Sequence, residues 1–210
     1  MSSPRGHLLP LLLMVGGCSH HPSAPLPLPP LHRTVRIVVS DSLGLPASDV
    51  AVRIVSKHDS AGVARVALGS TDAQGAVELV LVEDSWGVHA LQNAPRRVAG
   101  ATFTVPGRTR PAADTIQVVL TLHTPSVARG RALLGGRTDH SGTSVDCPPV
   151  PAAQITDSTG AYVIDLLPPG FWTITMFAFG FRLGVAPIHV TAPGETLSVR
   201  DVVLTSDPLP

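Results

Sequence analysis

Residues 155–175 of this 210-residue chain place two turns and two strands in close succession, and this constrains the fold more than any other stretch. Asp157-Ser158-Thr159-Gly160 is a tight-turn sequence whose glycine accepts a positive φ at no steric cost. Tyr162–Leu166 then shows the period-two pattern of a half-buried strand, with its larger side chains on one face. The segment therefore begins as a turn followed by a strand.

A second turn and strand follow directly. Pro168-Pro169-Gly170 fits a type II turn, because proline fixes φ at the second position and glycine supplies a positive φ at the third. Phe171–Phe177 is rich in aromatic and β-branched residues, which favour strands. This local pattern predicts a β protein.

Composition extends that prediction to the whole chain. The 21 prolines and 19 glycines favour many short strands with turns, and no long window shows helical periodicity. A hydrophobic fraction of 44% excludes a disordered chain of the charged, apolar-poor type. The formal net charge is zero, so the sequence lacks the basic footprint of a nucleic-acid-binding protein. We expect an all-β fold.

The body of the chain contains a degenerate internal repeat. Thr71–Val77 aligns with Thr156–Tyr162 through a shared Thr-Asp-x-x-Gly motif, and Val118–Thr121 aligns with Val202–Thr205. Each half therefore opens with a strand, carries the same turn in its middle and closes on a Val-Val-Leu-Thr strand. The repeat predicts two related β domains, at residues 33–123 and 124–210.

Alternation and turn signals also predict the strands within each half. Two stretches interrupt the pattern: residues 92–114, where only Ala101–Val105 has the character of a strand, and the polar, glycine-rich residues 135–151. In the first half the predicted strands are Thr34–Ser40, residues 50–55, Val63–Leu68, Ala76–Val82 and Trp86–Leu91. In the second half they are Val127–Leu134, Ala152–Thr156, Tyr162–Leu166, Phe171–Phe177, Ile188–Thr191 and Leu197–Leu204.

The N-terminus has the plan of an export signal. Met1–Gly17 holds a basic residue and an apolar run too short to span a bilayer. Val15-Gly16-Gly17-Cys18 resembles a bacterial lipobox, which implies a signal peptide at residues 1–17, lipid on Cys18 and a membrane anchor. Ser19 after the cysteine favours the outer membrane. The alternative is an ordinary signal peptide with Cys18 incidental.

The segment from residue 18 to residue 32 follows the signal peptide as a proline-rich tether. Five prolines in it favour an extended polyproline-type chain, which would separate the lipid from the first domain by roughly 40 Å. His20 and His21 lie beside the anchor without further ligands, so we expect no metal there.

The second half resembles the carboxypeptidase regulatory-like domain, a transthyretin-type β-sandwich. The resemblance covers residues 125–205 and rests on Gly130-Arg131-Ala132, Thr156-Asp157-x-x-Gly160-x-Tyr162, Leu167-Pro168-Pro169-Gly170-Phe171-Trp172 and Gly180-Phe181. Residues 33–122 resemble it more weakly, because Glu83–Gly87 replaces the Leu-Pro-x-Gly turn. The resemblance implies two tandem Greek-key sandwiches that are non-catalytic and serve as binding or structural modules. A carbohydrate-binding module of the envelope is the alternative.

The sequence offers little catalytic or metal-binding chemistry. Asp139-His140-Ser141 supplies an acid, a base and a hydroxyl, but neighbours on one loop rarely form a triad, so we interpret them as a polar loop. Cys147 lacks an obvious partner once Cys18 is lipidated, and a buried, inert thiol is favoured over a free or intermolecularly paired one. We therefore expect no enzyme activity, no cofactor and no metal site.

Aromatic residues gather in one place. Five of the eight lie between Phe171 and Phe181, and they include Trp172, which shares a strand face with Ile174 and Met176. Phe171 and Phe177 lie on the other face, and with Phe179 and Phe181 they form a candidate partner surface for an envelope protein or a glycan. Burial of this second face between the two sandwiches is the favoured interpretation.

Overall fold

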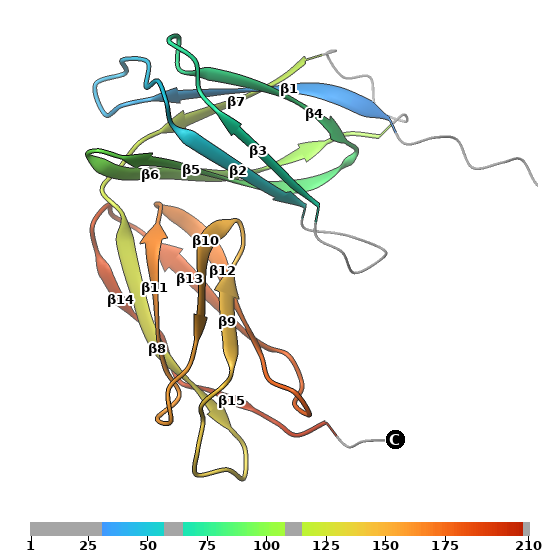
Figure 1. Ribbon diagram of the computed structural model, residues 1–210, viewed down its shortest axis with the longest axis vertical. Helices are drawn as coiled ribbons and strands as arrows, with labels where there is room; N and C mark the ends of the chain where they lie inside the picture. Colours follow the sequence, from blue (N-terminus) through green and yellow to red (C-terminus); the bar gives the residue numbers. More distant parts are fainter. Residues whose placement is uncertain (1–30, 57–64, 108–114, 208–210) are drawn as a thin grey trace, which may run out of the picture.

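The computed structural model describes residues 31–56, 65–107 and 115–207, and all the regular elements in these ranges are β-strands (Figure 1). The predicted signal peptide, Cys18 and most of the tether lie outside the described residues. The first half contains β1 (His32–Ser40), β2 (Ala51–Ser56), β3 (Val66–Ser70), β4 (Ala76–Val82), β5 (Asp84–Asn93), β6 (Arg96–Val105) and β7 (Thr115–Thr121). The second contains β8 (Ser126–Leu134), β9 (Ser144–Cys147), β10 (Val150–Ile155), β11 (Ala161–Leu167), β12 (Gly170–Phe177), β13 (Gly184–Val190), β14 (Thr196–Ser198) and β15 (Val202–Leu204).

Both halves have the same strand connectivity. In the first, the sheet β4-β1-β7 packs on the sheet β3-β2-β5-β6; in the second, β11-β8-β14 packs on β10-β9-β12-β13, and β15 also pairs with β8. The last strand of each half runs parallel to the first, β7 beside β1 and β14 and β15 beside β8. The chain is therefore two tandem Greek-key β-sandwiches of the transthyretin type.

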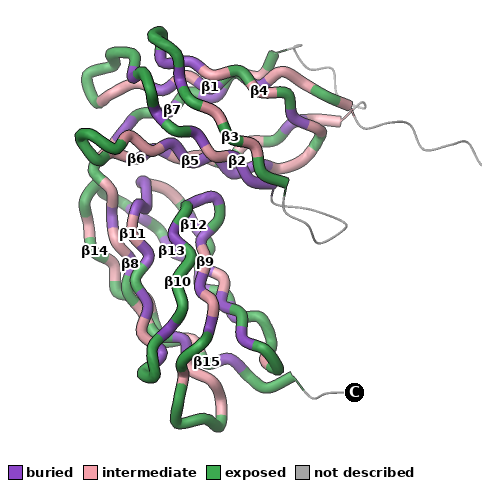
Figure 2. The backbone as a smooth tube through the Cα atoms, viewed as in Figure 1, coloured by how far each residue is buried: buried purple, intermediate pink, exposed green. Residues whose placement is uncertain are grey.

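Each sandwich has a hydrophobic core built by residues of both its sheets. Figure 2 shows buried positions recurring along the strands of both halves. Val35, Ile37 and Val39 alternate inward along β1 and are fully buried, as the sequence pattern predicts. In the second sandwich, Ile164 and Ile174 from opposite sheets are equally buried. The cores are dominated by aliphatic residues.

The Thr-Asp-x-x-Gly motif forms the same structure in both halves. Thr71 Oγ1 donates to the carbonyl of Ala47 at 2.7 Å and accepts the amide of Val50 at 3.0 Å. Thr156 Oγ1 repeats this with the carbonyl of His140 and the amide of Thr143, at 2.7 and 3.0 Å. Each buried threonine thus fixes the connection by which the chain passes from the first strand to the second, in the opposite sheet.

The glycine of the motif lies against the first strand of its own sandwich. Gly75 and Gly160 have φ of 71° and 78°, and each carbonyl accepts an amide of that strand, from Val39 and Ala132. A Cβ on either glycine would lie 2.4 Å from a backbone carbonyl oxygen. Only glycine can adopt this positive φ and also allow the backbone carbonyl oxygen to come so close.

The two tryptophans occupy equivalent positions, a correspondence that the sequence comparison missed. Trp86 in β5 and Trp172 in β12 each donate Nε1–H to the carbonyl four residues earlier, at 3.1 and 2.8 Å. The alignment of the tryptophans makes β5 the equivalent of β12, although the first half lacks the proline turn.

The Pro168-Pro169-Gly170 connection differs from the predicted type II turn. Gly170 has a φ of 132°, outside the range of that turn, and it already pairs with Val190 as the first residue of β12.

Several predictions about strands are wrong. The single strand predicted at Leu197–Leu204 is two short strands, β14 and β15. Residues 92–114 are not mainly a loop, because Arg96–Val105 forms the ten-residue β6, and ten cross-strand pairs with β5 outweigh its weak Ala-Gly propensity. Residues 135–151 contain β9, whose Val145 and Cys147 are fully buried. The two Val-Val-Leu-Thr strands occupy the same place in their sandwiches, but their residues do not align one to one. Val118 pairs with Ile37, whereas Val202 pairs with Ala132, which is the equivalent of Val39.

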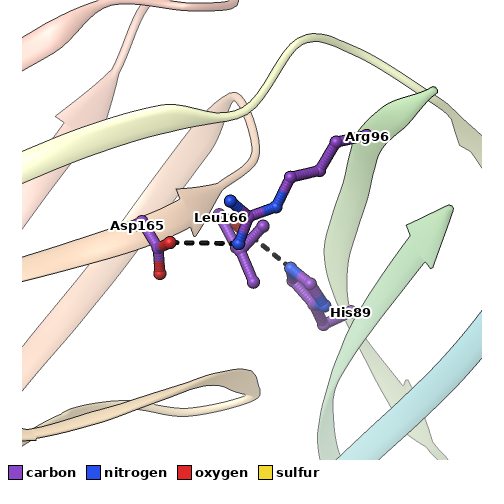
Figure 3. A network of polar contacts seen from close by, with 4 residues as sticks. All are labelled: His89, Arg96, Asp165 and Leu166. Carbon is purple, nitrogen blue, oxygen red and sulfur yellow. Dashed lines mark hydrogen bonds and ion pairs between the residues drawn. The ribbon is translucent and has the colours of Figure 1, made fainter. Parts of the chain in front are cut away.

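The second sandwich meets the first with one end, against the outer face of β2, β5 and β6 (Figure 1). The buried His89 bonds through Nε2 to the carbonyl of Leu166 at 2.9 Å, and Arg96 pairs with Asp165 at 3.1 Å (Figure 3). Arg53 Nη1 donates to the carbonyl of Pro149 at 2.8 Å.

Two glycines permit the close approach at this joint. A Cβ on Gly87 would lie 2.9 Å from the ring of Pro149, and a Cβ on Gly100 would lie 2.7 Å from both Pro168 and Trp172. Val98 of β6 belongs to the core of the second sandwich, so apolar packing is continuous across the joint. Close apolar packing therefore holds the two sandwiches together, in addition to the hydrogen bonds.

Gly160→Ala should destabilise the second sandwich by more than the about 1–3 kcal/mol of backbone strain alone, because the new methyl group also meets the carbonyl of Ala132. Gly136→Ala is the matched control, since Gly136 has a φ of 75° but open space around its Cβ position. Chemical denaturation of both variants measures the difference. Equal losses of unfolding free energy would contradict the role of the close approach.

Candidate functional site

The outer face of β12 and β13 is the most prominent exposed apolar surface of the second sandwich. Trp172, Ile174 and Met176 point into the core, as the alternation predicts. Phe171 and Phe177, on the other face of β12, are 76% and 56% exposed. Their expected burial between the two sandwiches is therefore wrong, because the joint is made by the end of the second sandwich and not by this sheet face.

Neighbouring strands extend the apolar surface. Val185 in β13 lies directly opposite Thr175 and is 55% exposed, and Ile155 in β10 lies opposite Ser144 and is 66% exposed. Directly opposite residues share a sheet face, so these side chains point the same way as Phe177. The sequence interpretation missed both, although Val185 alternates with the buried Ala186 and Ile188.

The hairpin that joins β12 to β13 adds two exposed apolar side chains. Phe179 is 93% exposed and Leu183 is 61% exposed. Phe181 differs from the other predicted surface residues, because it is half-buried against the core and lines a shallow cavity of about 370 Å³ with Arg137. We define the aromatic face as the exposed residues of this surface: Ile155, Phe171, Phe177, Phe179, Leu183, Val185 and His189.

Phe171 is restrained by its neighbour across the strands. Its ring stacks on that of His189 with the centroids 3.9 Å apart and the planes within 5°. Stacking therefore occupies one face of the Phe171 ring, although Phe171 remains more exposed than Phe177.

The polar residues singled out in the sequence have structural roles. His140 Nδ1 accepts the amide of Leu134 at 3.0 Å, and Asp139 Oδ1 accepts the amide of Ser141 at 2.9 Å. This hydrogen bond from Ser141 holds the pKa of the Asp139 carboxyl below its usual value. Asp139, His140 and Ser141 therefore form a bonded turn in which the imidazole is directed to the backbone.

Cys147 is fully buried in β9. Burial raises the pKa of its thiol to about 12, and the neighbouring Asp146 contributes in the same direction. The reactive thiolate is therefore scarce at neutral pH. The expected buried thiol is found.

A groove of about 410 Å³ lies between the edge strand β13 and the β14–β15 segment of the other sheet. Asp201 on its wall is paired with Arg131 at 2.6 Å. Within the described ranges, no group of three or more His, Cys, Asp or Glu side chains is placed to hold a metal ion. The same residues include no helix with the length and apolarity needed to cross a membrane.

No protein-family model matches the sequence, and no curated protein matches it either. The fold is similar to that of the minor pilin GBS52 of Streptococcus agalactiae, with 13% identity, a TM-score of 0.38, and coverage of 85% of this chain and 98% of that one. The shaft pilin SpaA of Lactobacillus rhamnosus GG gives 10% identity, a TM-score of 0.35, and coverage of 86% and 100%. A streptococcal ancillary pilin gives 12% identity and a TM-score of 0.37, with coverage of 85% of this chain and 63% of that one. Similarity at this level carries no functional inference.

Phe177→Ser should leave both sandwiches folded and docked, because Phe177 is more than half exposed and lies outside the joint. Met176→Ser, one residue earlier, should lower the free energy of unfolding by about 3 kcal/mol or more, because Met176 is fully buried. Thermal unfolding of the two variants provides the comparison. A large loss of stability for Phe177→Ser would instead make this residue part of the core.

In a Cys18→Ser background, Cys147 should not react with Ellman's reagent at pH 8 while the protein is folded, and should react fully in denaturant. Burial and the raised thiol pKa are the physical reasons. Rapid labelling of the native protein would contradict the buried, inert state.

Proposed function

We propose that this protein is a lipid-anchored, non-catalytic binding module of the bacterial cell envelope. Its two sandwiches would present the aromatic face to an envelope partner. The resemblance of residues 125–205 to the carboxypeptidase regulatory-like domain supports a binding or structural role, because such domains serve as spacers and docking modules.

The exposed aromatic face is the observation that carries the proposal. Phe177, Phe179 and Leu183 are each more than half exposed and follow one another along one hairpin. Exposed apolar side chains gathered on one surface are unfavourable in water, and such a surface marks an interaction site more often than chance. Aromatic side chains supply the largest contact area at such sites.

The state of the polar residues supports a non-catalytic role. Asp139 and His140 are bonded to backbone amides, and the thiol of Cys147 is buried with a raised pKa. Neither the loop nor the thiol offers an activated nucleophile beside a free base.

Anchoring and location rest on the N-terminal sequence. Val15-Gly16-Gly17-Cys18 at the end of an apolar run supports export and lipidation of Cys18, and Ser19 supports an outer-membrane address. A proline-rich tether between the lipid and residue 31 would hold the sandwiches away from the bilayer.

A glycan is the second candidate partner. The hydroxyl of Thr173 lies on the same face of β12 as Phe171 and Phe177, and this face therefore combines aromatic and polar groups. A glycan needs an open aromatic platform, however, and the stacked His189 occupies one side of Phe171. We therefore favour a protein partner, and binding to a glycan array would reverse this preference.

Photo-crosslinking in native envelopes should trap a partner of defined mass with the wild-type chain. The double variant Phe177→Ser, Phe179→Ser should lose this product, because it removes two exposed rings of the aromatic face. Val163→Ser, Val203→Ser is the matched control, since both valines are exposed on the opposite sheet. Equal crosslinking by both variants would refute the proposed binding face.

Cys18→Ser should move the protein from the membrane fraction to the soluble fraction after osmotic lysis. Removal of the lipid-bearing thiol leaves the described sandwiches without a strong membrane anchor. Unchanged membrane association would refute anchoring through Cys18 while leaving the binding face untested by this experiment, so the two parts of the proposal fail separately.

A further inference from the structure

The joint between the sandwiches depends on few polar contacts. His89 contributes a buried hydrogen bond and Arg53 a half-buried one, whereas the Arg96–Asp165 pair is exposed, with side-chain exposures of 58% and 42%. Exposed ion pairs of this kind add little to stability. His89 is therefore the principal buried polar contact between the two bodies.

The geometry assigns a neutral state to His89. Its Nε2 lies 2.9 Å from the carbonyl oxygen of Leu166, so Nε2 carries the hydrogen and donates it. A second proton, on Nδ1, would place a full charge on a side chain that is only 1% exposed. A buried charge without a partner is strongly unfavourable.

The charged groups around His89 do not offset that charge. Arg53 of β2 lies directly opposite His89 in the sheet and is itself a cation. Gly100 of β6, opposite on the other side, is uncharged. From the second sandwich, the carbonyl of Leu166 faces His89, the rings of Pro168 and Trp172 lie against the neighbouring Gly100, and the carboxylate of Asp165 is already paired with Arg96.

We propose that this joint is a pH-operated hinge, in which protonation of His89 releases the second sandwich from the outer face of β2, β5 and β6 while both sandwiches stay folded. Apart from Val98, each hydrophobic core draws its buried residues from its own sandwich, so separation would expose Val98 without unfolding either sandwich. The hinge point lies between His123, which is bridged to Val98 of β6, and Thr124, which accepts the amide of Gly194.

The direction of the pH dependence follows from His89. Burial lowers its pKa below the usual 6.5, and Arg53 acts in the same direction, while the hydrogen bond to Leu166 opposes them. The separated state therefore binds a proton more readily than the docked state. Docking is unaffected above about pH 6.5 and weakens as the pH falls from there towards the lower pKa of the docked state.

Small-angle X-ray scattering of the full chain tests the hinge. Between pH 6.5 and pH 5.0 the equilibrium constant for separation should rise by up to about 16-fold, since half of the separated state is already protonated at its pKa of about 6.5 and each further unit contributes up to tenfold. The radius of gyration should increase reversibly while the far-ultraviolet circular dichroism stays constant. An unchanged radius in the wild type would overturn the proposal.

Two variants assign the effect to His89. His89→Gln keeps a side-chain N–H donor but does not titrate, so its radius should be independent of pH over this range. His189→Gln, on the aromatic face, should retain the wild-type response. The proposal is also overturned if His89→Gln expands as the wild type does, or if His189→Gln abolishes the change.

Discussion

A buried threonine hydroxyl in each sandwich is the interaction on which the architecture depends. Thr71 and Thr156 each satisfy one carbonyl and one amide of the connection between the first and second strands. Without the hydroxyl, these backbone groups would be left unpaired in a dry site, at about 1–3 kcal/mol each. The contact fixes the connection through which the chain crosses to the opposite sheet, which carries the joint in the first sandwich and the aromatic face in the second.

Local chemistry could be predicted from the sequence, and contacts between distant segments could not. The turn at Asp157–Gly160 and the inward alternation of β1 follow from residues next to one another, and both are confirmed. β6 and β9 depend on partner strands that their weak sequences do not specify. The exposure of Phe177 depends on where the second sandwich docks, which Gly100 and His89 determine. Trp86 and Trp172 lie at nearly equal distances in sequence from Gly75 and Gly160, offset by one residue, which is the signal that could have revealed their equivalence.

The same sheet face has diverged between the two sandwiches. Aligned on the tryptophans, Thr173, Thr175 and Phe177 of β12 stand where β5 has Gly87, His89 and Leu91. The glycine that admits the Pro149 ring and the imidazole that bonds Leu166 are therefore replaced by threonines on the second face. That face cannot receive another sandwich end at the same close distance. It carries exposed phenylalanines instead, which is consistent with a partner of a different shape.

The central claim is that the aromatic face is open in the isolated protein and covered in the envelope. Hydroxyl-radical footprinting of the full chain, purified and in native envelopes, tests this most directly. The account predicts fast oxidation of Phe177 and Phe179 in the purified protein, slow oxidation of the buried Trp86 and Trp172 in both samples, and protection of the two phenylalanines in envelopes. Equal oxidation of Phe177 and Phe179 in both samples would contradict it.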